Sequence, residues 1–440
     1  MDVGLALGIV VVFIFLLIIG GFPLSYIFGF AALSILAMVG TVDFRMVMPS
    51  AMKLLLSYAL LALPMYILVG TLMSAGVLSS RLVEWINAVL GRGKSILGAT
   101  AVLFCTIFGA ISGSGLSAVA AVGKILIPQA EQYAYDREYM TGVIACSSLI
   151  AMLIPPSLPM ILFGVTAEIN VAMCFLAAAV PGLIVTSFYL VITFFLTRKV
   201  SSVSRPPRTE RRPMEILRST KRASTGLVLP VIILGGIYGG FFTPTEAAGV
   251  AVIWILFDGF VIHREFIPKF TDSLLEAGKL IGAIGVLLFF LFTFSQALIW
   301  IRVPQTIQSF VLATVTTKTG FLVMASIIIF FLGMVIEGSA VVILVAILLL
   351  PAATAYGINP YHFAAVAIVN TGVGNLTPPV APILYFAATV GDARVSFFPP
   401  SKYIKTVVTY LLFGHLPVLI LVMFIPALSL FLPNLWIAIM

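Results

Sequence analysis

Two proline-rich stretches decide how this chain is expected to fold: IPPSLPMILF (Ile154–Phe163) and TPPVAPILYF (Thr377–Phe386). They lie 223 residues apart, and at this offset their prolines coincide: Pro155, Pro156 and Pro159 align with Pro378, Pro379 and Pro382. The same offset gives 9 identities in 37 positions between 128–164 and 351–387. Roughly 3 are expected by chance in so biased a composition, so the chain contains an internal repeat.

A small polar cluster precedes each proline pair. ISGS (Ile111–Ser114) aligns with IEGS (Ile336–Ser339) after a two-residue gap. The clusters interrupt apolar segments near 96–130 and 320–356. Each segment has about 36 residues, slightly fewer than two full membrane crossings and a turn require. We therefore expect each repeat to form a re-entrant helical hairpin, a short loop and a span broken by Pro-Pro.

Composition places the whole chain in a membrane. Its 440 residues include only 24 Lys/Arg and 16 Asp/Glu, whereas a soluble protein of this length carries about 110 charged residues. Apolar residues make up 61%, and the mean hydropathy is +1.20. No soluble fold could bury so much apolar surface. The chain is therefore predicted to be an all-α polytopic membrane protein, which excludes soluble enzymes, nucleic-acid binders and secreted disulfide scaffolds.

Ten further apolar runs are candidates for membrane spans, since a crossing helix needs about 20 apolar residues. They lie near 3–21, 24–41, 54–78, 139–167, 171–197, 225–241, 245–262, 279–301, 361–390 and 405–432. No Lys or Arg precedes Arg45, so the first run is expected to be a span and not a cleaved signal peptide.

Positive charge is concentrated in one loop. Between Arg198 and Arg222 there are nine Lys/Arg and two Asp/Glu, which accounts for +7 of the net charge of +8. With this loop in the cytoplasm, alternation along the chain puts 20 of the 24 Lys/Arg on the cytoplasmic side and both termini outside. The basic charge thus indicates orientation and no nucleic-acid partner.

The same alternation makes the first hairpin open to the cytoplasm and the second to the outside. The two repeats are therefore expected to be inverted, an architecture typical of secondary transporters. Duplicated channels and membrane enzymes are the alternative. The expected divisions are 1–95 (N-terminal scaffold helices), 96–197 (transport-domain repeat 1), 198–224 (basic cytoplasmic loop), 225–318 (scaffold helices and arm), 319–402 (transport-domain repeat 2) and 403–440 (C-terminal helix).

The proline pairs are expected to open the backbone at mid-depth. Proline lacks an N–H and clashes with the carbonyl four residues earlier, so two in succession unwind a helix. Carbonyls freed there must be buried in protein or face a polar cavity, and a cation is a suitable partner for them. The second break has more polar neighbours, Asn370, Asn375 and Thr377, with Gly372 and Gly374 allowing close backbone approach. A proline-kinked packing helix is the alternative.

The hairpin tips are the expected second half of each site. GAISGSGLS (Gly109–Ser117) offers three hydroxyls and three glycines, and the helix that follows directs its N-terminal amides at the tip. Such an end attracts an anion such as a substrate carboxylate; close helix packing is the other interpretation.

Glu337 carries the only charge of the second tip. It lies between the charge-free stretches 319–336 and 338–391. A carboxylate at the bilayer centre costs at least about 3 kcal/mol. We expect Glu337 to face a site, a cation or a hydrogen-bonding partner, or else to be protonated and structural.

Other chemically active residues have structural interpretations. Thr243, Pro244 and Glu246 stand at the positions of a capping box that begins a helix. Lys124 can extend to the cytoplasmic interface. The three cysteines have no metal spacing and lie in apolar runs, and the three histidines are far apart. No H-E-x-x-H, G-x-S-x-G or Walker motif occurs, so we expect no enzyme activity and energy from an ion gradient or a partner.

With these residues considered, the chain resembles the large membrane subunit of tripartite ATP-independent periplasmic (TRAP) transporters over nearly its whole length. The resemblance is carried by LFCTIFGAISGSGLSAVAAVGKILIP (Leu103–Pro128), LIPPSLPMILFG (Leu153–Gly164), LPVIILGGIYGGFFTPTEAAGVAV (Leu229–Val252) and NLTPP (Asn375–Pro379). It implies a sodium-coupled importer of organic acids, C4-dicarboxylates or sialic-acid-like carboxylates, in a bacterial inner membrane. It also implies an elevator mechanism and two partners, a small four-helix membrane subunit and a periplasmic substrate-binding protein.

The resemblance also implies two Na⁺ sites. The first would use Ser112, Ser114 and Ser117 with backbone carbonyls near Ala151 and Ile154. The second would use Gly338, Gly374, Thr377 and the Val380 carbonyl. Candidates for the substrate site are Gly113, Gly115, Glu337, Asn370 and Asn375, and the helix-breaking residues are Pro155, Pro156, Pro378 and Pro379.

Two positions depart from the family pattern. Family members commonly have Asp in place of Glu337, and Gly soon after the second proline pair, where this chain has Ala381 and Pro382. A stand-alone sodium/anion symporter of the same architecture, without a binding protein, is the alternative function. An intramembrane enzyme is a third class, but the sequence offers it no nucleophile–base pair or metal cluster.

Overall fold

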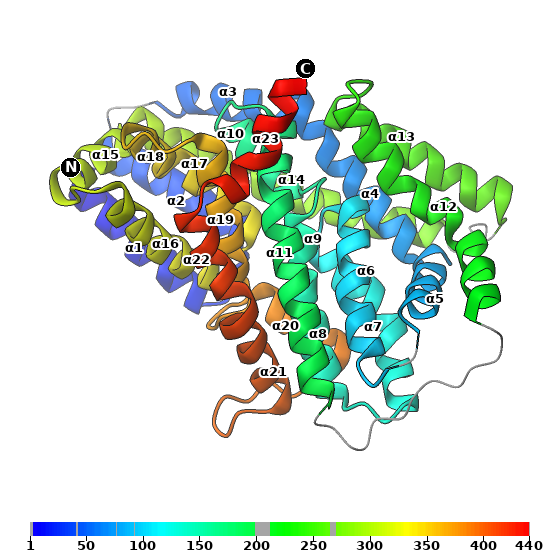
Figure 1. Cartoon of the computed structure of the whole chain (residues 1–440). Coiled ribbons are helices and arrows are strands. Elements are labelled where there is room, and N and C mark those ends of the chain that lie inside the picture. Colours follow the sequence, from blue (N-terminus) through cyan, green and yellow to red (C-terminus); the bar gives the residue numbers. More distant parts are fainter. Residues whose placement is uncertain are drawn as a thin grey trace.

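The fold is helical throughout the part of the chain that the structure describes (Figure 1). The computed structural model describes residues 3–40, 43–75, 77–91, 93–198, 212–264 and 270–439, and apart from one isolated bridge all its elements there are helices. Within these ranges six helices are long and apolar enough to cross a membrane, or up to eight if each of two bent pairs counts as one span. The prediction of an all-α polytopic membrane protein is confirmed.

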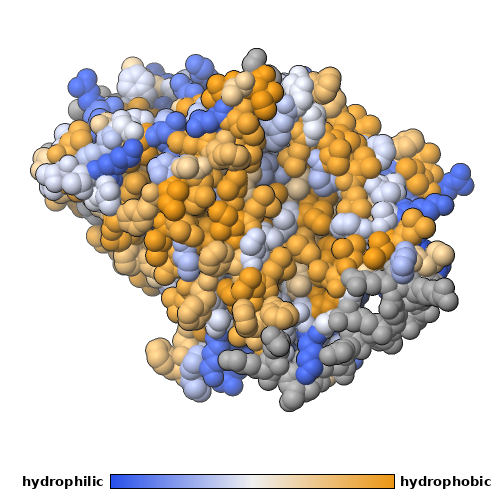
Figure 2. Space-filling model, viewed as in Figure 1, coloured by the Kyte–Doolittle hydropathy of each residue, from blue (hydrophilic) through white to orange (hydrophobic). Residues whose placement is uncertain are grey.

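The surface has the polarity of a membrane protein. Figure 2 shows hydrophobic residues across the middle of the visible face and hydrophilic ones mainly toward the upper and lower edges. Large apolar side chains such as Val231, Phe195 and Phe413 are more than half exposed. An apolar band between polar rims is what a bilayer requires of the protein surface.

One group of helices comes from the segment before the first repeat and from the segment between the two repeats. Their bounds are α1 (Val3–Ile19), α2 (Leu24–Val39), α3 (Phe44–Leu55), α4 (Ala62–Ala75), α5 (Leu78–Leu90), α12 (Arg212–Tyr238), α13 (Pro244–Phe257), α14 (Phe270–Trp300) and α15 (Val303–Thr314). A 3₁₀ turn (Tyr58–Leu61) precedes α4, and a π-helical turn (Asp258–Ile262) follows α13. Helix α14 packs on α2, α3 and α4, while α12 packs on α5 and α13.

The two repeats form the other group. The first contains α6 (Ile96–Ser112), α7 (Gly115–Gln132), α8 (Arg137–Ser148), α9 (Ile150–Leu153), α10 (Leu158–Thr166) and α11 (Val171–Arg198). The second contains α16 (Lys318–Val335), α17 (Gly338–Leu348), α18 (Leu350–Ala355), α19 (Pro360–Asn375), α20 (Pro382–Gly391), α21 (Lys402–Tyr410), the π-helical turn η3 (Leu411–His415), α22 (Leu416–Phe424) and α23 (Ala427–Ile439). In Figure 1, α8 and α21 lie toward the lower edge, whereas α15 and α18 lie toward the upper edge.

Both proline pairs interrupt helices. After α9 the chain leaves the helix at Ile154, and α10 restarts at Leu158 with the Ser157 hydroxyl capping the Met160 N–H at 3.3 Å. The helices before and after this break differ in direction by 40°. After α19 the chain restarts as α20 at Pro382. A residue without an N–H cannot sit inside a helix without losing a hydrogen bond, which explains both interruptions.

The capping box predicted at the start of α13 is also present. The Glu246 carboxylate accepts a hydrogen bond from the Thr243 N–H at 2.8 Å, and the Thr243 hydroxyl accepts one from the Glu246 N–H at 3.2 Å. Glu246 thus satisfies backbone donors at a helix end.

Part of the segment expected to be a basic loop is helical. Helix α12 begins at Arg212, inside the segment 198–224 that was expected to be a loop; residues 199–211 lie outside the described part. The early turns of α12 are held on α5, where the Trp85 indole donates to the Thr220 hydroxyl at 3.0 Å. Tertiary packing thus extends a helix into a charged run.

The segment 403–440 is not a single helix. Helix α22 ends at Phe424, and Ile425, which precedes Pro426, has φ −119° and ψ 82°. A residue before proline is driven out of the helical region by contact with the proline ring. The chain then continues as α23.

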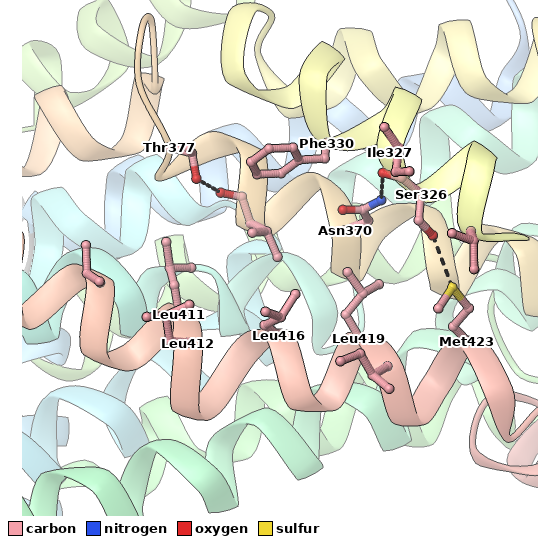
Figure 3. A pocket seen from close by; sticks show the side chains of 14 residues that line it. Ser326, Ile327, Phe330, Asn370, Thr377, Leu411, Leu412, Leu416, Leu419 and Met423 are labelled. Carbon is pink, nitrogen blue, oxygen red and sulfur yellow. Dashed lines mark hydrogen bonds between the residues drawn. The ribbon is translucent and has the colours of Figure 1, made fainter.

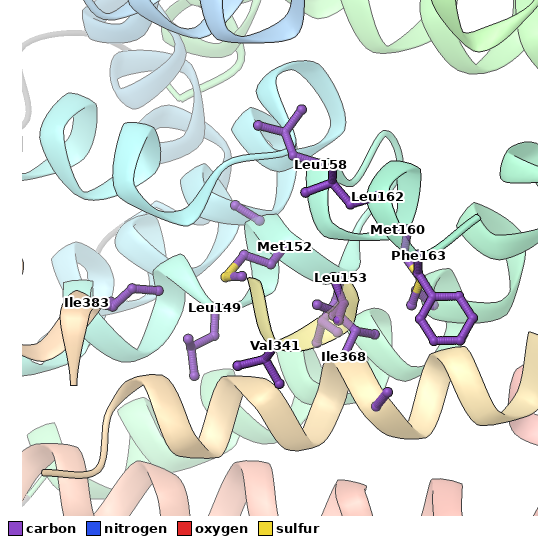
Figure 4. Packing of buried hydrophobic residues seen from close by; sticks show 14 of the residues in the cluster. Leu149, Met152, Leu153, Leu158, Met160, Leu162, Phe163, Val341, Ile368 and Ile383 are labelled. Carbon is purple, nitrogen blue, oxygen red and sulfur yellow. The ribbon is translucent and has the colours of Figure 1, made fainter. Parts of the chain in front are cut away.

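The core joins the two repeats. Figure 4 shows Leu149 and Met152 of the first repeat beside Val341, Ile368 and Ile383 from three helices of the second. All five side chains are buried. The broken helices and hairpins of both halves therefore share one packed interior.

Candidate functional site

The first hairpin tip is a two-residue turn between α6 and α7. Gly113 has φ +64°, and a side chain there would collide with the carbonyl oxygen of Pro156. The Ser114 hydroxyl caps α7 by accepting from the Ser117 N–H at 3.3 Å. Ser112 is fully buried, and its hydroxyl accepts from the Ser114 N–H at 3.4 Å. Glycine is needed here for the left-handed backbone and for the close contact with the break.

The first tip and the first break are in direct contact, as the sequence predicted. The Leu158 N–H, just after the proline pair, donates to the Gly113 carbonyl at 3.2 Å. One turn before the tip, a methyl group at Gly109 would lie 2.5 Å from the Cα of Ala151. Ile154 ends α9 in the same break, and both prolines are buried. Hydroxyls and opened backbone are therefore gathered in one small region.

The second tip begins α17, and Glu337 is its N-cap. The Glu337 carboxylate accepts from the Ser339 N–H at 2.9 Å and from the Ser339 hydroxyl at 3.2 Å. A carboxylate at this position complements the positive end of the helix. Glu337 therefore has a hydrogen-bonding partner, one of the roles expected for it from the sequence.

The second break contacts the second tip and the helix leading to it. The N–H groups of Val380 and Ala381 donate to the Met334 carbonyl at 3.0 and 3.2 Å. A methyl group at Gly374 would lie 2.6 Å from the carbonyl carbon of Gly333. One at Gly338 would lie 2.8 Å from the Asn375 amide nitrogen. The backbones approach so closely because these positions carry no side chain.

The two tip–break contacts repeat each other. In the first half Gly109 packs against Ala151, and in the second half Gly333 packs against Gly374. Ala151 and Gly374 occupy equivalent positions of the repeat. The internal duplication of the sequence thus has a counterpart in packing. The inversion of the two copies across a membrane stays a prediction.

Met152 joins the two sites, and the sequence analysis did not single it out. Its side chain lies against Gly115 of the first tip and Gly338 of the second, within 3.2 and 3.0 Å of where a methyl group at each would stand. In the repeat Met152 aligns with Asn375. The alignment shows that Met152 is equivalent to Asn375, but no local sequence pattern indicates its contact with both tips.

Gly70 of α4 is a second unexpected neighbour of the first tip. A methyl group there would lie 3.1 Å from the Ser112 Cβ and 3.4 Å from the Ser117 hydroxyl oxygen. Helix α4 belongs to the segment 1–95 that was expected to form the scaffold. The first tip therefore faces this segment directly.

Asn375 has a polar atom that no group of the described residues satisfies. The residue is 1% exposed, and its Oδ1 atom has no hydrogen-bond partner among the described residues. A buried amide oxygen without a partner costs free energy comparable to a lost hydrogen bond. A cation or a polar ligand at the second tip would remove that cost.

Asn370 and Thr377 lie on the other side of α19. The Thr377 hydroxyl donates to the Val373 carbonyl at 2.8 Å, and the Asn370 amide donates to the Ser326 carbonyl of α16 at 2.5 Å. Figure 3 shows both side chains in the wall of an apolar groove. Asn370, a substrate-site candidate from the sequence, thus contacts α16 at the apolar groove, while Thr377 lies next to the break.

The chemistry available at these sites is that of oxygen ligands. No group of three or more His, Cys, Asp or Glu residues that could hold a metal occurs within the described ranges. Serine hydroxyls, backbone carbonyls near the breaks and the Asn375 amide oxygen are the atoms present. Hard cations prefer such oxygen ligands. Discontinuous helices that meet inside a multi-pass helical protein are typical of the class of membrane transporters.

Comparison with known proteins identifies the family. The family model for the tripartite ATP-independent periplasmic transporter, DctM component, matches residues 10–428. The chain is 34% identical over 378 residues to the C4-dicarboxylate TRAP transporter large permease protein DctM of Pseudomonas aeruginosa, covering 86% of each chain. It is 30% identical to the sialic acid TRAP transporter large permease protein SiaM of Vibrio cholerae, covering 96% of each. The chain therefore belongs to the DctM family of TRAP transporter large permeases.

Solved structures support the fold. The chain aligns with the YdaH transporter of Alcanivorax borkumensis at a TM-score of 0.58 and 16% identity, covering 88% of each chain. It aligns with MtrF of Neisseria gonorrhoeae at a TM-score of 0.57 and 13% identity, covering 85% of this chain and 83% of that one. The resemblance found in the sequence is confirmed, as is the expectation of a multi-pass protein in the bacterial inner membrane. TRAP large permeases in general work with a small membrane subunit and a substrate-binding protein.

Proposed function

We propose that this chain imports organic acids into the cell by coupling their movement to Na⁺, with the two tip–break pairs as cation sites. The unsatisfied Oδ1 atom of Asn375, beside the opened backbone of the second break, is the observation that carries the proposal. The first site would use the Ser112, Ser114 and Ser117 hydroxyls with carbonyls of the first break. Carboxylate or sulfonate substrates are supported by the relatives, which are named for C4-dicarboxylates, sialic acid and isethionate.

The driving force is adequate for import. Moving one elementary charge through 100 mV is worth about 2.3 kcal/mol, so two Na⁺ supply on the order of 4–5 kcal/mol before any concentration gradient is counted. That free energy supports roughly a 10³-fold accumulation of a neutral solute. Each negative charge that the substrate carries inward cancels the electrical contribution of one Na⁺, so a dicarboxylate dianion moved with two Na⁺ depends on the Na⁺ concentration gradient alone.

Contacts between the helix groups support an elevator mechanism. The first tip meets the expected scaffold at Gly70 of α4, a position with no side chain to interlock with its neighbours. A contact without interlocking side chains would allow one group of helices to slide past another. In this proposal the two repeats move together, because their cores are packed as one.

Partners complete the proposed importer. A small four-helix membrane subunit would bind beside this chain in the lipid bilayer, and a periplasmic substrate-binding protein would deliver the organic acid. Both partners are inferred from the membership of this chain in the family.

Reconstitution tests this function. The full chain, its small subunit and its binding protein are placed in proteoliposomes, and uptake of labelled succinate and sialic acid is measured with an inward Na⁺ gradient, an inward K⁺ gradient, or none. Uptake should require Na⁺ and the binding protein. Na⁺-driven uptake without the binding protein would instead identify a stand-alone symporter, and uptake that survives collapse of all ion gradients would exclude ion coupling.

A further inference from the structure

An apolar groove runs along the outside of the second repeat. It lies between α16, α19 and the helices α21–α22, with a cavity volume of about 470 Å³, and its wall is shown in Figure 3. Most of the wall consists of aliphatic side chains. Of its polar side chains, Asn370, Thr377 and Ser326 already make hydrogen bonds within the protein. The groove therefore suits an apolar occupant.

The groove is open to the outside of the protein. Ile327, Val408, Leu412 and Ile420 line it and are 45–53% exposed. In a membrane protein such a face meets the hydrocarbon of the bilayer. From Val408 to Met423 the helices extend about 22 Å at 1.5 Å per residue. One leaflet of the hydrocarbon core is about 15 Å thick, so the groove is long enough for an acyl chain.

A positive charge stands near the start of α21, at the end of this helix that the charge distribution predicts to be cytoplasmic. Lys405 precedes Val408 and Leu412 by three and seven residues, so the three share one face of α21 and its continuation. Lys405 is exposed and makes no ion pair with any described residue, whereas its neighbour Lys402 is paired with Asp136 at 3.0 Å. The Lys405 ammonium can therefore bind an anion at the end of the apolar groove that begins at Val408.

Polar groups next to Lys405 form a small recess. It has a volume of about 180 Å³, and its lining includes Lys402, Lys405, the Asp136 carboxylate and hydroxyl-bearing residues of α21 and α11. Because Lys402 is paired with Asp136, Lys405 supplies the uncompensated positive charge. Basic recesses between helix ends on the cytoplasmic side are suited to phospholipid head groups. Along α21 and its continuation a charged residue therefore precedes an apolar face, which is the order of a head group and an acyl chain in a lipid.

We propose that this chain binds an anionic phospholipid of the cytoplasmic leaflet, with its phosphate at Lys405 and one acyl chain in the groove between α16, α19 and α22. The bound chain would contact Val373 and Thr377, so it would support the helix that carries the second proline break. The inference does not depend on the ion or the substrate that is transported.

Lipid binding by the purified full chain tests the proposal. Native mass spectrometry measures the affinities for phosphatidylglycerol and phosphatidylcholine. Lys405→Gln should weaken phosphatidylglycerol binding about fivefold, the equivalent of the roughly 1 kcal/mol that one Lys contributes near an anionic surface. Lys405→Arg should retain the affinity. Lys124→Gln, which removes another exposed Lys expected on the cytoplasmic side, should leave it unchanged.

A second variant tests the groove. Val408→Trp fills its entrance and should weaken binding of both lipids, whereas Val231→Trp, on an exposed face of α12, should not. A photo-cross-linker at Leu412 should form adducts with lipid. Affinities equal to wild type in both Lys405→Gln and Val408→Trp, or cross-links from Leu412 to another protein, would overturn the proposal.

Discussion

At the residue scale, the second break depends on Asn375, the last residue of α19, and on Thr377, two residues beyond it, whose side chains face different surroundings. Asn375 is buried against the second tip with one oxygen unsatisfied, and Thr377 lies beside the break at the edge of the apolar groove. The sequence analysis selected both as polar neighbours of the second proline pair, where opened backbone must be buried in protein or face a polar cavity. The direction in which each side chain points depends on tertiary packing, which the sequence alone does not give.

Thr377→Val should weaken Na⁺ activation of transport with little effect on folding. Valine keeps the branched shape of threonine but removes the hydroxyl oxygen proposed as a Na⁺ ligand. The measurement is the Na⁺ concentration for half-maximal uptake in proteoliposomes, which should rise severalfold. Thr389→Val is the control, since the Thr389 hydroxyl makes the same kind of bond to the carbonyl four residues earlier but on an exposed face. Equal Na⁺ activation in the two variants would count against the second site.

His415 ties three helices together and should matter for stability. It is fully buried, with Nδ1 3.1 Å from the Tyr189 hydroxyl of α11 and Nε2 2.8 Å from the Val369 carbonyl of α19. The carbonyl can only accept, so Nε2 carries the proton in this arrangement.

His415→Ala leaves the Tyr189 hydroxyl without this partner and should destabilise the protein by about 1–3 kcal/mol. Tyr189→Phe should cost less, and the double variant less than the sum of the two. Thermal unfolding in detergent measures all three. Strictly additive losses would show that the two side chains are not coupled.

At the element scale, α16 and α19 cross where neither has a side chain. A methyl group at Gly374 would lie 2.6 Å from the Gly333 backbone, so Gly374→Ala should force the helices apart and cost about 1–3 kcal/mol. Gly249→Ala in α13 is the matched control, because no atom lies within 4 Å of the new methyl group. It should stabilise its helix by up to about 1 kcal/mol. Melting temperatures that move in the same direction in both variants would contradict the close crossing.

The sequence predicts the elements of the two repeats well and their neighbours less well. Both proline breaks occur where the repeat places them, because the missing N–H acts locally. The early start of α12 was not predicted, since it rests on Trp85 of α5. The place of Met152 between Gly115 and Gly338 was missed for the same reason. Contacts between segments far apart in the chain leave no local pattern to read.

At the scale of the whole molecule, the elevator proposal requires the first tip to leave α4. The Cβ atom of Ser117 lies 3.5 Å from where a Cβ at Gly70 would stand, within the range that a disulfide spans. Gly70→Cys with Ser117→Cys should therefore cross-link in this conformation. The three native cysteines are fully buried and are replaced by alanine in the background.

Saturating Na⁺ and substrate should change the yield of this cross-link, since they bias the position of the moving helices through the second Na⁺ site, which Ser117→Cys leaves intact. The yield is read on gels after brief oxidation, with each single cysteine as the control. A yield that is the same with and without both solutes, in a reconstituted protein that transports, would argue against sliding at this contact.

The central claim is that opened backbone and side-chain oxygens at the two tips bind Na⁺, and the most direct test is the number of ions bound by the purified chain. Binding of radioactive Na⁺ should saturate at two ions per chain in the wild type and at one in Asn375→Leu, which removes the unsatisfied amide oxygen. No saturable binding, or two ions still bound in Asn375→Leu, would contradict the claim.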